Sequence, residues 1–90
     1  MQTIDIDGAW LLADGSSRWC CVDTLVSQDR LRLARILRDG TRYQVERYQR
    51  GDGLPQWRGA WWNVQRDHSL TDSEANARAL AAQWLDGVPN

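Results

Sequence analysis

The sequence predicts an α+β domain, with an antiparallel β-meander of about four to five strands packed on one C-terminal α-helix. Three observations support this class. Residues 10–65 contain short runs rich in β-branched and aromatic types, separated by turn-forming residues. Residues 71–87 have the capping residues and apolar spacing of a helix. The length of 90 residues, with 42% hydrophobic and 26% charged side chains, fits one small globular domain spanning residues 1–90.

The first two expected strands form a hairpin. Residues 10–13 are a short apolar run, and residues 14–17 favour a turn. Residues 18–25 are rich in β-branched and aromatic types, so we expect them to return beside the first strand and to lie inside the sheet. Cys20 and Cys21 fall on this strand. We expect them to be small core residues, because adjacent cysteines are poorly placed for a disulfide and the chain has no other cysteine for a zinc site.

Residues 29–38 fit two structures. As a helix, they place their apolar side chains on one arc and end at Gly40, a suitable C-terminal cap. As a strand, they lead into Asp39-Gly40, a strong two-residue hairpin signal, and then into a second strand over residues 41–49. We favour the hairpin, because its register produces an apolar face. That register places Ile36 opposite Tyr43 and Ala34 opposite Val45.

The next expected strand carries three tryptophans. A loop over residues 50–55, with two glycines and a proline, precedes a strand over residues 56–65. Because side chains alternate along a strand, Trp57 and Trp61 point to one face and Trp62 points to the other. One face must cover the core. Either Trp62 or the pair of Trp57 and Trp61 is therefore the best candidate for a contact surface.

The C-terminal helix has the clearest signals. Thr71 is the expected N-cap, and Glu74 three residues later completes a capping box. Gly87 is expected to end the helix. The apolar residues recur at the spacing of a buried stripe. They are Ala77, Leu80, Ala81, Trp84 and Val88.

The net charge of −1 conceals an uneven distribution. Residues 1–26 and residues 67–90 each have a charge of −3, whereas residues 27–66 have a charge of +5. The basic side chains are all arginine. If the fold lays the acidic ends across the basic middle, the charges neutralise one another; otherwise a positive face is left for an anionic partner.

The chain lacks the residue patterns of common enzyme sites. His68 is the only histidine, so no histidine cluster can form. Asp5 and Asp7 alternate as on one face of a strand, but no further oxygen ligands follow, and a solvated face is the simpler interpretation. No nucleophile motif or glycine-rich phosphate loop is present. We expect a protein without enzymatic activity, metal or cofactor.

Two binding hypotheses remain. The first is protein–protein recognition, with a protein partner or a second copy, through exposed tryptophan and arginine side chains, which often dominate interface energy. The candidate binding residues are Trp57, Arg58, Trp61, Trp62, Arg42 and Arg47. The alternative is single-stranded nucleic-acid binding, in which a tryptophan stacks on bases and arginines contact phosphates. Its candidate residues are Trp57, Trp61 or Trp62 for stacking, with Arg42, Arg47, Arg58 and Arg66 for the phosphates.

The N-terminal residues lack the basic start and apolar block of a secretory signal, and no apolar run reaches the length of a membrane span. We expect a cytoplasmic protein with no membrane association. A tryptophan-rich meander followed by an alanine-rich helix resembles the layout of many small bacterial and phage proteins. This resemblance, over residues 35–88, includes no motif that carries a function to this chain.

Overall fold

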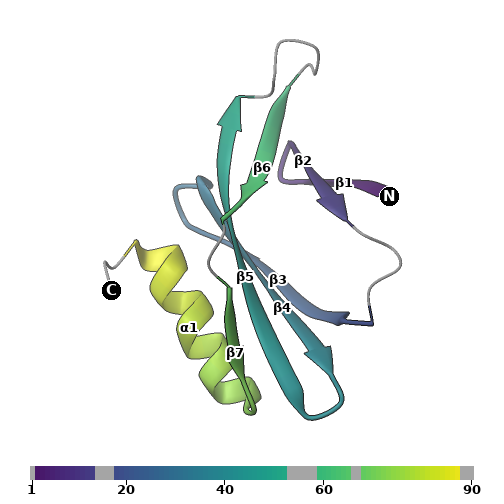
Figure 1. The fold of residues 1–90 in the computed structure, drawn as a ribbon. Helices are drawn as coiled ribbons and strands as arrows, with labels where there is room; N and C mark the ends of the chain where they lie inside the picture. The colour runs from purple at the N-terminus through teal and green to yellow at the C-terminus, as the bar shows by residue number, and fades with distance from the viewer. Residues whose placement is uncertain (1, 14–17, 53–58, 66–67, 88–90) are drawn as a thin grey trace.

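The computed structural model describes residues 2–13, 18–52, 59–65 and 68–87. Within them, strands form one sheet and a C-terminal helix packs on it (Figure 1). The elements are β1 (Gln2–Ile6), β2 (Ala9–Ala13), β3 (Cys20–Val26), β4 (Arg32–Asp39), β5 (Arg42–Asp52), β6 (Ala60–Val64), β7 (Ser69–Thr71) and α1 (Glu74–Asp86). The predicted α+β class with a C-terminal helix is confirmed.

The strand order is β1-β2-β6-β5-β4-β3, and β7 pairs with β5 beyond the end of β6. All pairs are antiparallel except β2 and β6, which run parallel, with Ala9 opposite Ala60 and Trp10 opposite Trp61. The sheet therefore has seven strands and is mixed, unlike the predicted antiparallel meander of four to five strands. The additional strands are β1 and β7. The sheet is mixed because β2 lies beside β6, which is distant in sequence, instead of beside β3.

The first hairpin turns at Asp7-Gly8. Both residues have positive φ, 54° and 82°, as in a type I′ turn, which favours Asp-Gly. The Asp5 carboxylate accepts a hydrogen bond from the Gly8 N–H at 3.1 Å and so supports the turn. β2 consequently pairs with β1, while β3 pairs with β4 at the opposite edge of the sheet. The predicted pairing of residues 10–13 with residues 18–25 is wrong, and its turn lies outside the described residues.

The strand interpretation of residues 29–38 is confirmed, because β4 pairs with β5 along its whole length. The turn is Gly40-Thr41 instead of Asp39-Gly40. Gly40 has a φ of +64° and Thr41 has no positive φ, the pattern of a type II′ turn with glycine first. This turn moves each cross-strand partner by two residues, so the side chains stay on the expected faces. The observed pairs are Ile36 with Val45 and Ala34 with Arg47.

The two faces of the sheet bury separate apolar clusters. On what we call the inner face, β2 packs with β4, β5 and β6. The buried residues there are Ala9, Leu11, Leu33, Tyr48 and Trp62. On the outer face, α1 covers β4 and β5. The buried residues there are Ala34, Ile36, Val45, Ala77 and Ala81. Because successive side chains of a strand point to opposite faces, neighbouring residues of β4 serve different clusters.

The helix begins and ends with side-chain and backbone caps. Its N-cap is Ser73, whose hydroxyl accepts from the Asn76 N–H at 3.3 Å, so the prediction of Thr71 is wrong. Thr71 instead ends β7, where it pairs with Tyr43 of β5. Gly87 ends the helix in the left-handed conformation, with a φ of 70°, as predicted. The helix is therefore two residues shorter at its start than the capping box suggests.

Strand β3 lies at an edge of the sheet and pairs with β4 alone. Its register shifts between Cys21 and Asp23, which leaves Val22 without a cross-strand partner in a β-bulge. Cys20 and Cys21 are both exposed free thiols. The prediction that they are core residues is wrong, because the strand expected inside the sheet lies at its border.

Candidate binding surface

Two tryptophans are built into the fold. Trp62, on the inner face, is 4% exposed, and its indole N–H donates to the carbonyl oxygen of Ile6 at 3.0 Å. The Trp84 indole N–H lies 3.0 Å from the Leu33 carbonyl oxygen and 3.1 Å from that of Tyr48, and it donates to both. These bonds connect β6 to the first hairpin and α1 to the sheet. Both rings therefore stabilise the domain, and the Trp62 ring is buried.

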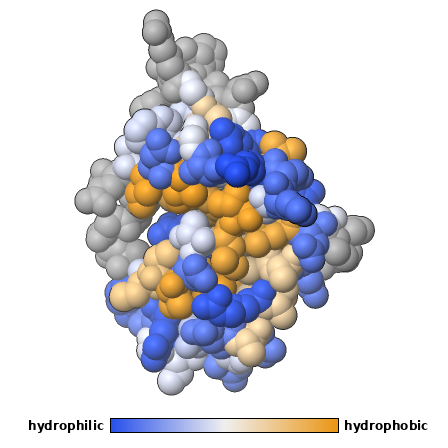
Figure 2. Space-filling model, turned by 180° about the vertical axis from the view of Figure 1, so that it is seen from behind, coloured by the Kyte–Doolittle hydropathy of each residue, from blue (hydrophilic) through white to orange (hydrophobic). Residues whose placement is uncertain are grey.

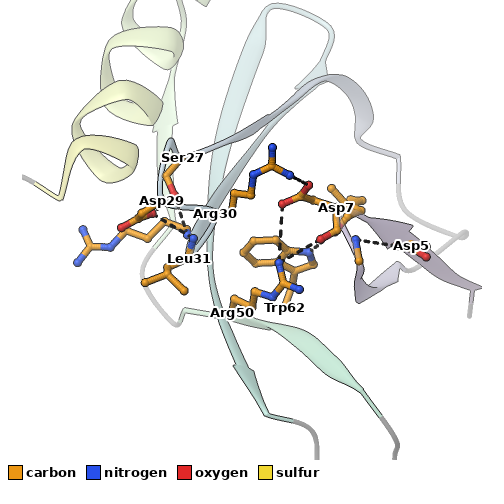
Figure 3. A network of polar contacts seen from close by, with 11 residues as sticks. Asp5, Asp7, Ser27, Asp29, Arg30, Leu31, Arg50 and Trp62 are labelled. Atoms are coloured by element: carbon orange, nitrogen blue, oxygen red, sulfur yellow. Dashed lines mark hydrogen bonds and ion pairs between the residues drawn. The ribbon is translucent and has the colours of Figure 1, made fainter.

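Trp62 also contacts a charged network on the inner face, where the first hairpin meets β5 (Figure 3). The Arg50 guanidinium lies over the Trp62 ring, 5.8 Å from its centroid. Its Nη1 lies 3.7 Å from Asp7 Oδ2 and donates to the Asp7 carbonyl oxygen at 3.0 Å. Arg30 binds the other carboxylate oxygen of Asp7. An aromatic ring and a carboxylate thus hold one guanidinium between them.

In this network the acidic N-terminal segment contacts the basic middle of the chain. Asp7, from the acidic segment, binds two arginines of the middle, Arg30 and Arg50. In the acidic C-terminal segment, Arg78 of α1 binds Asp23 of the acidic N-terminal segment at 2.9 Å. The sequence is compatible with neutralisation of the basic middle or with an uncovered positive face. At Asp7 the charges neutralise one another.

The first hairpin presents large apolar side chains to solvent. Trp10 and Leu12 point to the same side of β2 and are 39% and 52% exposed. Trp10 is flanked by Asp5 of β1 and, in the parallel pair, by half-buried Trp61 of β6. Residues opposite one another in neighbouring strands have side chains on one face. We call Asp5, Trp10, Leu12 and Trp61 the Trp10 surface.

Other large apolar side chains of the molecule are also exposed to solvent. Seen from behind, the protein has a band of apolar side chains that runs between polar regions (Figure 2). Large apolar residues that are at least 38% exposed include Ile4, Val22, Leu31, Val64 and Leu70. Scattered apolar residues are normal on a protein surface, so position and chemistry must distinguish a binding surface. The Trp10 surface is distinguished by a tryptophan beside a carboxylate.

The predicted binding residues do not form one cluster. Trp61 is half-buried next to Trp10, whereas Trp62 is buried on the other face of the sheet. Arg47 is half-buried, and its guanidinium donates to the Ser69 hydroxyl at 2.7 Å. Arg42 is exposed at the β4–β5 turn, about 30 Å along β5 from the residue that pairs with Trp61. Trp57, Arg58 and Arg66 lie outside the described residues.

Three polar side chains interact farther along the inner face. The Tyr48 hydroxyl donates to Glu46 Oε1 at 3.2 Å, and Arg35 Nη1 lies 3.8 Å from the same oxygen. Burial raises the pKa of Tyr48, and the Glu46 carboxylate raises it further, so the hydroxyl stays protonated and keeps donating. The three side chains satisfy one another beside a buried cluster. This arrangement is suited to stabilising the sheet, since each group is already bound to another.

Among the described residues, no three histidine, cysteine or acidic side chains gather as they would around a metal ion. His68 is exposed, just before β7. An open cleft of about 400 Å³ lies between the β3–β4 connection and the end of α1, and Asp29 lines it. The Asp29 carboxylate is already used, because it accepts from the Ser27 hydroxyl and from the Leu31 N–H. These hydrogen bonds lower the pKa of Asp29.

Trp10, Leu12 and Asp5 were not among the candidates from sequence. The missed signal is Asp7-Gly8, which, treated as a two-residue turn, places Asp5 opposite Trp10.

Within the described part of the chain, no helix is long and apolar enough to cross a membrane. Comparison of the chain with protein-family models, curated proteins and solved structures gave no match.

Proposed function

We propose that this domain is a non-enzymatic protein–protein interaction module that binds its partner through the Trp10 surface. The observation that carries the proposal is the exposure of Trp10 beside Leu12 on a strand whose other face buries Ala9 and Leu11. Tryptophan is enriched among the residues that dominate interface energy, and its large rigid ring loses little conformational entropy on binding. The strand that carries Trp10 is anchored by Ala9 and Leu11, which are buried in the inner cluster.

Trp61 adds to this surface from the neighbouring strand. It is paired with Trp10 in the parallel register, so the two indoles occupy adjacent positions on the outer face. Helix α1 packs on β3, β4, β5 and β7. A partner that covers Trp10 and Leu12 would continue the layer that the helix begins.

Removal of the exposed ring tests the proposal. The wild type, Trp10→Ala and the control Leu70→Ala are immobilised, and the proteins each captures from cells that contain the chain are quantified by mass spectrometry. Leu70 is 59% exposed on β7, so its truncation removes a similar apolar contact elsewhere. We expect a set of proteins that is lost with Trp10→Ala and kept with Leu70→Ala. Equal capture by all three would contradict the proposal.

A homodimer is the simplest form of such an interaction. Size-exclusion chromatography with light scattering, at several protein concentrations, measures it directly. A dimer that Trp10→Ala dissociates would identify the partner as a second copy. Dimerisation that is unaffected by Trp10→Ala would place the interface elsewhere and count against the Trp10 surface.

Single-stranded nucleic-acid binding is the competing hypothesis, and the charges of the described residues weaken it. Three arginines of the basic middle are occupied: Arg30 and Arg50 by Asp7, and Arg32 by the Trp84 ring and carbonyl. Because these three arginines already have partners, they are less available to contact phosphates and to release counterions from the nucleic acid. A mixed-sequence oligonucleotide that binds at low salt, with a steep loss of affinity as salt rises, would support this hypothesis over the protein partner.

A further inference from the structure

The chain repeatedly places an arginine over an aromatic ring. Arg32 lies 4.7 Å from the centroid of the Trp84 ring, Arg50 lies 5.8 Å from that of Trp62, and a third contact of 5.9 Å joins Arg38 to Tyr43. A guanidinium is planar and weakly hydrated, so it stacks on a ring and still donates hydrogen bonds at its edge.

The contact at Trp62 shows what a complete site requires. The ring supplies the face, Arg50 lies over it, and Asp7 supplies a carboxylate at 3.7 Å and a carbonyl oxygen at 3.0 Å (Figure 3). The carboxylate offsets the positive charge, and the ring limits access of water to the guanidinium. A ring, an acidic oxygen and an arginine thus form one unit.

Trp10 and Asp5 have two parts of the same unit. They are directly opposite one another in the β1–β2 pair, so their side chains lie on one face. Trp10 is 39% exposed, and Asp5 is exposed as well. One carboxylate oxygen of Asp5 accepts from the Gly8 N–H, which fixes the orientation of the carboxylate at the end of the hairpin. In the part of the chain that the structure describes, no arginine lies over Trp10 or pairs with Asp5.

We propose that Trp10 and Asp5 bind an arginine side chain of a protein partner, in the way that Trp62 and Asp7 bind Arg50. The inference rests on the proposed function and specifies the chemistry of the partner. The charge is complementary, because the only ionised group of the Trp10 surface is a carboxylate. Arginine suits the site better than lysine, since its flat guanidinium can cover the ring and bind the carboxylate together.

Two peptides test this chemistry on the intact domain. Blocked Gly-Gly-Arg-Gly-Gly and its citrulline counterpart, which has the same shape without the charge, are titrated into ¹⁵N-labelled protein. The indole N–H signal of Trp10 is assigned from its loss in Trp10→Phe. We expect this signal to shift saturably with the arginine peptide. The citrulline peptide is expected to bind roughly threefold to tenfold more weakly, from the lost cation–π and ion-pair contacts.

Two variants identify the carboxylate. Asp5→Asn keeps the oxygen that accepts from Gly8, and it is expected to weaken arginine binding roughly twofold to fivefold. Asp72→Asn, an exposed aspartate near α1, is the matched control and should leave binding unchanged. Equal binding of the arginine and citrulline peptides by the wild type would overturn the proposal, as would equal affinity of Asp5→Asn and wild type.

The result separates the two proposals. Partner capture that depends on Trp10, together with equal binding of both peptides, would support the interaction surface and refute the proposal that it binds arginine. Selective binding of the arginine peptide without any captured partner would refute the proposed function and leave the arginine site. Dimerisation that is lost in both Trp10→Ala and Arg42→Gln would support the arginine site and identify Arg42 of a second copy as the arginine that it binds.

Discussion

Trp62→Phe should destabilise the domain strongly, although phenylalanine is also large and aromatic. The substitution removes the hydrogen bond from the indole N–H to the Ile6 carbonyl, worth about 0.5–1.5 kcal/mol. It also removes ring atoms from a side chain that is 4% exposed, at about 0.8 kcal/mol per buried carbon, or about 1–2 kcal/mol in total. The expected loss of unfolding free energy is therefore about 2–3 kcal/mol.

Trp10→Phe is the matched control, because it makes the same chemical change at an exposed position. We expect its unfolding free energy to stay within about 0.5 kcal/mol of the wild type. For a domain of this size, the loss at Trp62 corresponds to a decrease of roughly 10–20 °C in Tm.

The assay is urea unfolding followed by far-ultraviolet circular dichroism, which does not depend on tryptophan emission. The midpoint should fall for Trp62→Phe with little change in the slope of unfolding free energy against urea. Equal midpoints for the two variants would refute the assignment of Trp62 to the core and of Trp10 to the surface.

Three further predictions concern the turn, a titrating pair and the edge strand. Gly40→Ala should cost about 1–2 kcal/mol in urea unfolding, because alanine is strained at a φ of +64°; an unchanged midpoint would refute the turn. The hydrogen bond from Arg78 lowers the pKa of Asp23 below 3.8, so this pair stabilises the fold above about pH 4 and its contribution is lost as pH falls through the folded pKa. Arg78→Gln should raise that pKa in a carboxyl NMR titration, and no rise would contradict the pairing. Cys20 and Cys21 should both react with a thiol reagent in the native protein, whereas labelling only after unfolding would contradict their exposure.

The features predicted correctly from the sequence are those encoded by nearby residues. Gly87 ends the helix, and Ala77 and Ala81 of the predicted stripe are buried. The β4–β5 hairpin was expected from alternating side chains around a glycine turn. Its register was displaced because two adjacent dipeptides, Asp39-Gly40 and Gly40-Thr41, can each form the turn, and only packing of the strands selects one.

The parallel pairing of β2 with β6 could not be predicted in the same way. It joins Trp10 to Trp61 across about fifty residues of chain, and no local pattern encodes that contact. The site depended on this pairing, so Trp61 was identified without its neighbour. Asp7-Gly8 is a local signal for a hairpin of β1 and β2, and it competes with the predicted hairpin over residues 10–25.

The central claim is that the domain buries some indoles in its two clusters and presents the Trp10 ring to solvent for a partner. Broadening of the indole N–H signals by a soluble paramagnetic agent measures this directly for each ring. We predict that the Trp10 signal broadens most, while the signals of Trp62 and Trp84 are protected. Protection of Trp10 equal to that of Trp62 in the monomer would contradict the claim.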